Sequence, residues 1–218
     1  MTGAAPWRWN TALLRPDRLR AVVAVGTPHG PRPVTPPVAA LRAAAGDNHY
    51  TVYFQQPGTA DEELARDPYA TIRRALWGAS GDANPWRHLL PEDGGLLDTW
   101  PEPAQLPDWF TEADVHTYAE SFGPQGFTGA LNWFRNMDRN WTLTRAWPQQ
   151  VIPTPALYMT GDRDLAPSLP GGAELLSGRS PYVPRLRATV LLPGCGHWTQ
   201  QDRPAEVNAA LLDFLHAL

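Results

Sequence analysis

The residues best suited to chemistry in this sequence are a histidine and an aspartate that each follow a short apolar run. His197 stands in VLLPGCGHWTQQ, residues 190–201, where the apolar run leads into a glycine-punctuated turn. Asp164 stands in GDRDL, four residues after an apolar run that ends at Thr160. A carboxylate beside an imidazole can fix its tautomer and stabilise its protonated form while the imidazole activates water. The two residues therefore predict acid–base catalysis.

Simpler roles for the same residues stay open at this level. Asp162 competes with Asp164 as the acid, and both are typical of an Asx-turn that only ends a strand. A histidine in a tight glycine-rich loop is often structural. Cys195 lies two residues before His197, which is poor geometry for a nucleophile–base pair, so we assign it a structural role.

The two loops can meet only if the strands before them are parallel neighbours. Val190, Leu191 and Leu192 form a continuous apolar run, which predicts a strand buried on both faces. Residues 156–160 predict a second strand. Because the carboxyl ends of parallel strands open at the same edge of a sheet, we expect Asp164 and His197 to come together there.

The composition of the chain argues against several classes of partner and cofactor. The net charge of −4 and the absence of any Lys/Arg cluster argue against a nucleic-acid partner. No apolar run is long enough to cross a membrane, and no signal-peptide pattern opens the sequence. The single cysteine excludes an intrachain disulfide, so we expect a cytoplasmic protein. The six histidines show no metal-ligand spacing, and we expect neither a metal nor a cofactor.

The predicted secondary-structure pattern changes twice along the 218-residue chain. Residues 1–46 predict an α/β part with the end of one helix and one strand. Residues 47–147 hold most of the tryptophans and predict helices separated by Pro and Gly loops, which we interpret as a helical lid. Residues 148–218 again predict an α/β part, with two strands and a C-terminal helix. A doubly wound domain normally places several strands before this point, so the chain is expected to begin in the middle of one.

Local signals place the elements inside these parts. Pro68 should break or restart a helix over residues 59–77, and Thr111 is the expected N-cap of another helix. The remaining expected elements are a helix tail at 10–14, a buried strand at 19–25, a helix over 131–141 and a strand at 189–192. The closing helix begins at Pro204 and should bury Val207, Leu211, Phe214, Leu215 and Leu218 on one face.

Longer motifs carry a resemblance to a known family. They are HYTVYFQQPG (49–58), GALNWFRNMDRNW (129–141), GDRDL and PGCGHWTQQDRPAEVNAALLDFL. Together they resemble the soluble epoxide hydrolases of the α/β-hydrolase fold, from about Trp9 to the C-terminus. The resemblance implies an α/β fold class: the C-terminal part of an α/β-hydrolase sheet with an inserted helical lid.

The resemblance also implies roles for individual residues. Such enzymes open the epoxide with an Asp nucleophile while two lid tyrosines hydrogen-bond its oxygen, and a His–Asp pair activates the water that hydrolyses the ester. Carried over, His197 is the base, Asp164 its partner and Tyr50 the first lid tyrosine. A packing role is the alternative for Tyr50 and the better assignment for Tyr53. The side chains expected to contact a small apolar epoxide are Trp133, Phe134 and Trp198.

Two departures from the family pattern bear on activity. Phe134 occupies the position of the second tyrosine, and loss of one such donor costs about 2–4 kcal/mol of transition-state stabilisation. The nucleophile would fall at about Thr2, and no Asp stands between Met1 and Leu14. A hydroxyl would give an ether, which this mechanism cannot hydrolyse. The HG-P segment of the family's oxyanion hole is absent as well.

The sequence thus predicts an epoxide hydrolase by family, with little or no turnover by this chain alone. A misassigned start, a decayed gene and a half-protein that pairs with a separate N-terminal chain stay open. A sheet whose edge strand lacks its neighbouring strand tends to pair with another chain. The expected partners are therefore a second copy of this chain or a missing N-terminal part. The alternatives are a haloalkane dehalogenase-like hydrolase, which Tyr50 in its YFQ-PG context argues against, and a non-catalytic binding protein that retains the lid. No G-x-S-x-G occurs to support a serine esterase.

Overall fold

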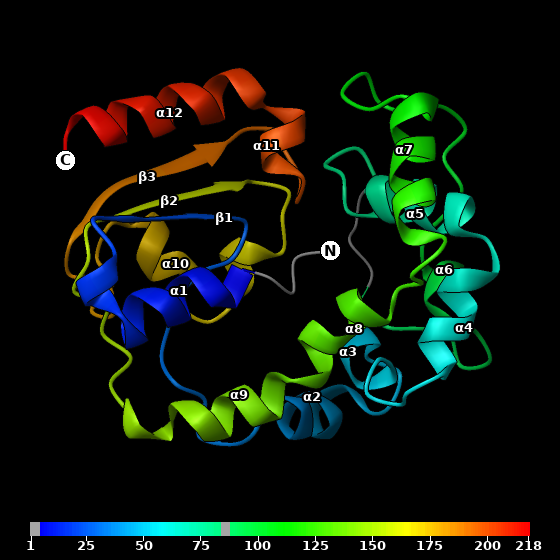
Figure 1. The fold of residues 1–218 in the computed structure, drawn as a ribbon, viewed down its shortest axis with the longest axis horizontal. Coiled ribbons are helices and arrows are strands. Elements are labelled where there is room, and N and C mark those ends of the chain that lie inside the picture. Colours follow the sequence, from blue (N-terminus) through cyan, green and yellow to red (C-terminus); the bar gives the residue numbers. More distant parts are fainter. Residues whose placement is uncertain (1–4, 84–87) are drawn as a thin grey trace. The chain divides into compact units, whose positions relative to one another are not determined.

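A computed structural model describes residues 5–83 and 88–218 (Figure 1). The described residues divide into two compact units. The first holds those within 1–32, 80–82 and 146–218, and the second those within 33–79 and 83–145. We placed residues 1–46 with the α/β part, but residues 33–46 belong to the second unit because helix α2 (Pro37–Ala45) contacts α3 (Tyr50–Tyr53) and α9 (Met137–Leu143).

The first unit is built on a parallel sheet of three strands in the order β1-β2-β3. The strands are β1 (Val22–Val25), β2 (Ala156–Gly161) and β3 (Leu186–Leu192). Val22 is paired with Ala156, and Gly161 with Leu192. The prediction that the second and third strands are parallel neighbours is confirmed, and all three strands end at one edge of the sheet.

Helices cover both faces of this sheet (Figure 1). Buried residues of α1 (Ala5–Leu14) and α10 (Gly172–Leu176) form a core with one face, around Trp9 and Tyr158. On the other face Val207 and Phe214 of α12 (Pro204–His216) pack against Leu157 and Met159. Short helical turns complete the unit: η2 (Pro16–Arg18), η4 (Ala166–Ser168) and α11 (Thr199–Asp202).

Two expectations about burial at this side of the sheet are wrong. The run 190–192 was expected to be buried on both faces, yet Leu191 is 47% exposed. The reason is position: β3 is an edge strand. The closing helix buries Val207 and Phe214, but Leu215 and Leu218 are 49% and 45% exposed. Because β3 is an edge strand, the sheet covers only part of the apolar face of α12 and leaves these two leucines exposed.

The second unit is helical and is inserted between β1 and β2. Pro68 restarts the helix as predicted, because α4 (Thr59–Arg66) ends before α5 (Pro68–Gly78). Thr111 caps the next long helix, since its Oγ1 accepts a hydrogen bond from the Asp114 backbone N–H at 3.2 Å. The remaining helices are α6 (Leu96–Thr99), α7 (Glu112–Phe122), α8 (Thr128–Arg135) and the turn η3 (Thr144–Ala146).

One helix expected over 131–141 is two helices in the structure. α8 ends at Arg135 and α9 begins at Met137, so Asn136 lies between them. The Asn136 side chain donates a hydrogen bond to the Asn132 carbonyl at 2.8 Å. Asparagine competes with helical backbone bonds in this way, which is why the apolar periodicity alone did not reveal the break.

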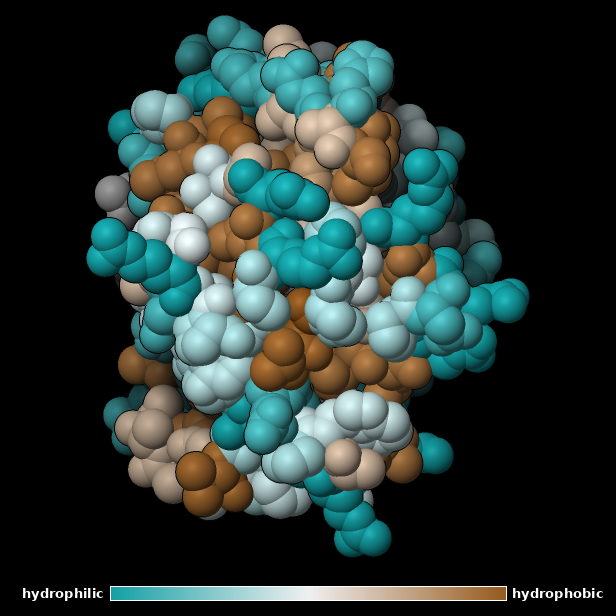
Figure 2. Space-filling model, turned by 90° about the vertical axis from the view of Figure 1, so that its left-hand side faces the viewer, coloured by the Kyte–Doolittle hydropathy of each residue, from teal (hydrophilic) through white to brown (hydrophobic). Residues whose placement is uncertain are grey.

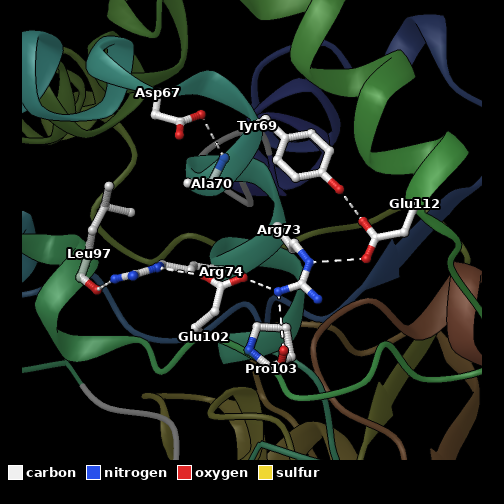
Figure 3. A network of polar contacts seen from close by, with 9 residues as sticks. All are labelled: Asp67, Tyr69, Ala70, Arg73, Arg74, Leu97, Glu102, Pro103 and Glu112. Carbon is white, nitrogen blue, oxygen red and sulfur yellow. Dashed lines mark hydrogen bonds and ion pairs between the residues drawn. The ribbon is translucent and has the colours of Figure 1, made fainter.

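Two neighbouring arginines of α5 hold the segment that follows α6 (Figure 3). Arg73 contacts Glu102 and donates a 3.2 Å hydrogen bond to Glu112 at the start of α7. Arg74 donates to Glu102 at 2.9 Å and to the Leu97 carbonyl at 2.9 Å. Since the Arg73 side chain is only 14% exposed, its bonds are better shielded than ordinary surface pairs.

In the described part of the chain, no helix is both long enough and apolar enough to span a membrane.

Candidate active site

His197 and Asp164 lie side by side at the carboxyl edge of the sheet in the first unit. His197 Nδ1 is 2.9 Å from Asp164 Oδ1, and the two side chains are 8% and 1% exposed. A buried carboxylate accepts hydrogen bonds, so Nδ1 carries the proton that joins the two residues. The opposite ring nitrogen, Nε2, is then the atom able to accept a proton.

Asp164 is itself held by the end of β2 and the turn after it. Thr160 Oγ1 donates to Asp164 Oδ2 at 3.2 Å, and the Ala166 backbone N–H donates to Oδ1 at 3.3 Å. Both carboxylate oxygens are thereby engaged. These donors fix the orientation of the carboxylate toward the imidazole.

Asp162, the competing acid, contacts the histidine's turn by another route. Its Oδ1 accepts the Gly194 backbone N–H at 2.8 Å, and the Arg163 backbone N–H donates to the Cys195 carbonyl at 3.1 Å. These bonds join the loop after β2 to the loop after β3. Asp162 therefore holds the two loops together, whereas Asp164 forms the contact with His197.

Glycines make the close approach of these loops feasible. A Cβ on Gly161 would lie 1.9 Å from the Cys195 carbonyl oxygen, which no real Cβ tolerates. Gly26, directly after β1, has a φ of 69°, and its Cβ would lie 3.3 Å from Asp164 Oδ2 and 3.6 Å from His197 Nδ1. Sequence reasoning missed Gly26, although a glycine at a strand's carboxyl end was a signal for it.

Two further residues near this turn were singled out by the sequence. The Trp198 ring lies edge-on to the His197 ring with a centroid separation of 5.5 Å, and Trp198 is half-buried. Cys195 is fully buried, and burial raises the pKa of its thiol to about 12. A thiol with so high a pKa holds almost no thiolate near neutral pH, which supports a structural role.

Tyr50 and Phe134 come together in the second unit. Their ring centroids are 5.9 Å apart in an edge contact, and Phe54 lies 5.5 Å from Tyr50 and 5.1 Å from Phe134. The His49 ring stacks on Tyr50 at 4.9 Å. Tyr50 and Phe134 are both half-buried, and Trp133, beside Phe134 on α8, is half-buried too.

Tyr53 is oriented differently from Tyr50. Its hydroxyl donates to Glu63 Oε2 at 2.8 Å, and burial together with this carboxylate raises its pKa well above the usual range. The phenol of Tyr53 is thus committed to a contact inside the helical unit.

A partly buried ion pair, also missed by sequence reasoning, ties α8 to α4, and its arginine also reaches the turn after α3. Arg135 contacts Asp61 through its guanidinium and donates from Nε to the Phe54 carbonyl at 2.8 Å. The hydrogen bond from Arg135 holds the pKa of Asp61 well below its usual range. Gln55 adds bonds to Thr51 and to the Phe134 carbonyl. These contacts set the position of Phe134 relative to α3.

Among residues 5–83 and 88–218 no three His, Cys, Asp or Glu side chains gather as a metal site would require. The predicted nucleophile position, Thr2, lies outside these described residues.

Comparisons with known proteins agree on one family. No family model matches the sequence. Epoxide hydrolase A of Mycobacterium tuberculosis is 43% identical over 217 residues, covering 96% of this chain and 65% of that protein. The crystal structure of epoxide hydrolase A from Mycobacterium thermoresistibile superposes with a TM-score of 0.87 at 44% identity, covering 97% of this chain and 66% of that one. Potato epoxide hydrolase I gives 0.87 at 31% identity, with 98% and 67% covered. The chain belongs to the epoxide hydrolase family.

Membership confirms the family and the fold class that the motifs predicted. The small parallel sheet, with helices inserted between β1 and β2, is part of an α/β-hydrolase fold. The chain spans about two thirds of the length of these epoxide hydrolases, 65% of the first relative named above.

Proposed function

We propose that the chain supplies the water-activating half of an epoxide hydrolase. The observation that carries this proposal is the 2.9 Å contact between His197 Nδ1 and Asp164 Oδ1 at the carboxyl edge of the sheet. Nε2 of His197 takes a proton from water, and the resulting hydroxide attacks the carbonyl of an enzyme ester. Asp164 holds the tautomer and stabilises the imidazolium that forms.

Tyr50 serves the opening step in the same proposal. The epoxide oxygen becomes an alkoxide as the strained ring opens, and a phenol O–H can donate a hydrogen bond to it. Packing by Phe54, Phe134 and His49 holds the Tyr50 ring in one orientation. Phe134, at the position of a second donor, keeps the packing without the hydroxyl.

The bond-forming carboxylate is the missing component. The family's elbow would fall near Thr2, and the first acidic residue of the sequence is Asp17. Without a carboxylate no ester forms for His197 to hydrolyse. We therefore expect little or no turnover by the chain as given. The substrate we propose is a small apolar epoxide, and its hydrolysis needs water rather than a cofactor.

The test compares the chain as given with the longest in-frame product of its gene. DNA upstream of Met1 is translated, and both proteins are incubated with styrene oxide while diol is measured by chromatography. A longer product with a G-x-D-W-G-like elbow should form diol, and the given chain should stay at the uncatalysed rate.

Trapping identifies the role of His197 in the active protein. His197→Gln should leave ester formation intact and block hydrolysis, so intact-mass spectrometry should show a mass gain of one styrene oxide. Diol formation by the 218-residue chain above the uncatalysed rate, and unchanged by His197→Gln, would overturn the proposal. So would wild-type turnover by the longer His197→Gln protein.

A further inference from the structure

A second concave site lies at the end of the sheet opposite to His197. It is a pocket of about 370 Å³ in the first unit, formed by the segments that enter the three strands. These segments are residues 16–20 before β1, 153–155 before β2, and 185–187 at the start of β3. Because parallel strands begin at one edge and end at the other, this pocket does not share residues with the His197–Asp164 site.

Three of the nine residues that line this pocket are arginines. Arg20 lies before β1, and Arg185 and Arg187 flank the first residue of β3, so all three lie at the end of the sheet where the strands begin. Arg185 donates to the Pro153 carbonyl at 3.4 Å, which holds it across the pocket. Among the described residues, none of the three forms an ion pair, although other arginines of this chain do.

The acidic groups nearby do not neutralise these arginines. Asp17 is engaged with Arg15 at 2.7 Å, and hydrogen bonding to that guanidinium lowers its pKa. Among the described residues that line the pocket there is no Asp or Glu. The pocket is a local excess of positive charge on a protein whose net charge is −4.

One lining residue of the pocket, Thr154, carries a buried hydroxyl without a partner in the described part of the chain. Thr154 is 4% exposed, and its hydroxyl has no hydrogen-bond partner among the described residues. Buried hydroxyls are normally bonded, so this donor marks a site where a polar ligand would be accommodated. Figure 2 looks onto this end of the sheet and shows hydrophilic side chains interleaved with hydrophobic ones.

We propose that this pocket binds a small phosphate-bearing anion. Guanidinium groups form bidentate hydrogen bonds with phosphate oxygens. Three guanidinium groups balance the double charge of a phosphate better than the single charge of a carboxylate. A volume of about 370 Å³ lies at the small end of the range for ligand pockets. The chain's negative net charge disfavours nucleic acid as the source of the phosphate.

Calorimetric titration of the full chain with inorganic phosphate and pyrophosphate tests this site. Arg20→Gln and Arg187→Gln should each weaken binding by at least about tenfold, because each removes a charge-assisted contact. Arg187→Lys should restore part of the loss by restoring the charge. Both arginines are exposed, so neither change is expected to disturb folding.

Arg179→Gln is the matched control, because Arg179 is an exposed arginine of the same unit outside the pocket lining. It should leave the affinity unchanged. Sodium acetate as a competitor separates a phosphate site from a general carboxylate site and should not displace pyrophosphate. No binding by the wild type, equal weakening by Arg179→Gln, or full displacement by acetate would each overturn the proposal.

Discussion

At the scale of single residues, Asp162 and Asp164 show how neighbouring carboxylates acquire different tasks. Asp162 contacts the backbone N–H of Gly194, whereas Asp164 lies 1% exposed against His197 and accepts bonds from Thr160 and Ala166. The two loops approach closely because Gly161 has no side chain. The tautomer of His197 should depend on Asp164 and not on Asp162.

We expect ¹⁵N NMR to find neutral His197 protonated at Nδ1 in the wild-type chain. Asp164→Asn should shift the ring toward the Nε2–H tautomer, because an amide offers its NH₂ as well as its carbonyl to Nδ1. Asp162→Asn is the control and should leave the tautomer as it is. An unchanged tautomer in Asp164→Asn would show that Asp164 does not orient the ring.

His49 should make the stability of the helical unit depend on pH. Its Nδ1 accepts the Thr51 backbone N–H at 3.1 Å as the N-cap of α3, which requires the neutral ring. Burial, and secondly the charge of His88, lowers the pKa of His49 below its ordinary value. As pH falls below about 6.5, His49 becomes protonated in the unfolded chain but stays neutral in the folded chain. The free energy of unfolding therefore decreases.

Urea unfolding between about pH 8 and pH 5 measures this dependence. His49→Asn keeps an N-cap acceptor that does not titrate, so its stability should fall less steeply with acid. His29 contributes in the same direction, because burial lowers its pKa as well, and it should account for part of the slope that remains. Identical slopes in wild type and variant would contradict the role of His49.

At the scale of elements, Asp61 holds three helical segments together. It accepts the Gly58 backbone N–H at 3.0 Å before α4, and it contacts both Thr128 and Arg135 of α8. Arg135 in turn reaches the Phe54 carbonyl after α3. The Asp61 and Arg135 side chains are 18% and 12% exposed, so their contact is shielded from water.

Asp61→Asn should destabilise the chain by about 1–3 kcal/mol, because it removes the charge from a largely buried hydrogen-bonded pair. Chemical denaturation followed by tryptophan fluorescence gives the free energy of unfolding. Asp47→Asn is the matched control: Asp47 is also paired with an arginine, Arg42, but its side chain is 81% exposed. A smaller loss in Asp61→Asn than in Asp47→Asn would rule out Asp61 as a structural centre.

At the scale of the whole molecule, β1 has one edge that pairs with no strand among the described residues. Val22 and Gly26 donate their N–H groups to Pro155 and Met159 on the β2 side. Because N–H groups alternate along a strand, those of Val23 and Val25 point to the other edge. Such an edge can pair with another strand, so we predict that the chain self-associates through β1.

Sedimentation velocity at several concentrations should reveal this association. Val23→Pro removes an outward N–H without breaking a bond to β2, and it should shift the chain toward monomer. Val23→Ala shortens the same side chain but keeps the N–H, and it should associate like the wild type. If both variants sediment like the wild type at every concentration, association does not use this edge.

The sequence by itself determined the features that depend on local patterns and motifs. Apolar runs followed by glycines placed β2, β3 and the His197 turn, Pro68 and Thr111 marked helix starts, and the motifs identified the family. Each of these signals lies within a few residues, where backbone preferences act directly.

Only the tertiary structure decided the features that depend on residues far apart in the chain. Leu191 is exposed because β3 is an edge strand, and helix α2 belongs to the helical unit because of its contacts with α3 and α9. Asp164 rather than Asp162 faces His197, 33 residues away, and the arginine pocket collects segments that enter three strands. Burial and proximity are set by packing between elements, and no local pattern encodes them.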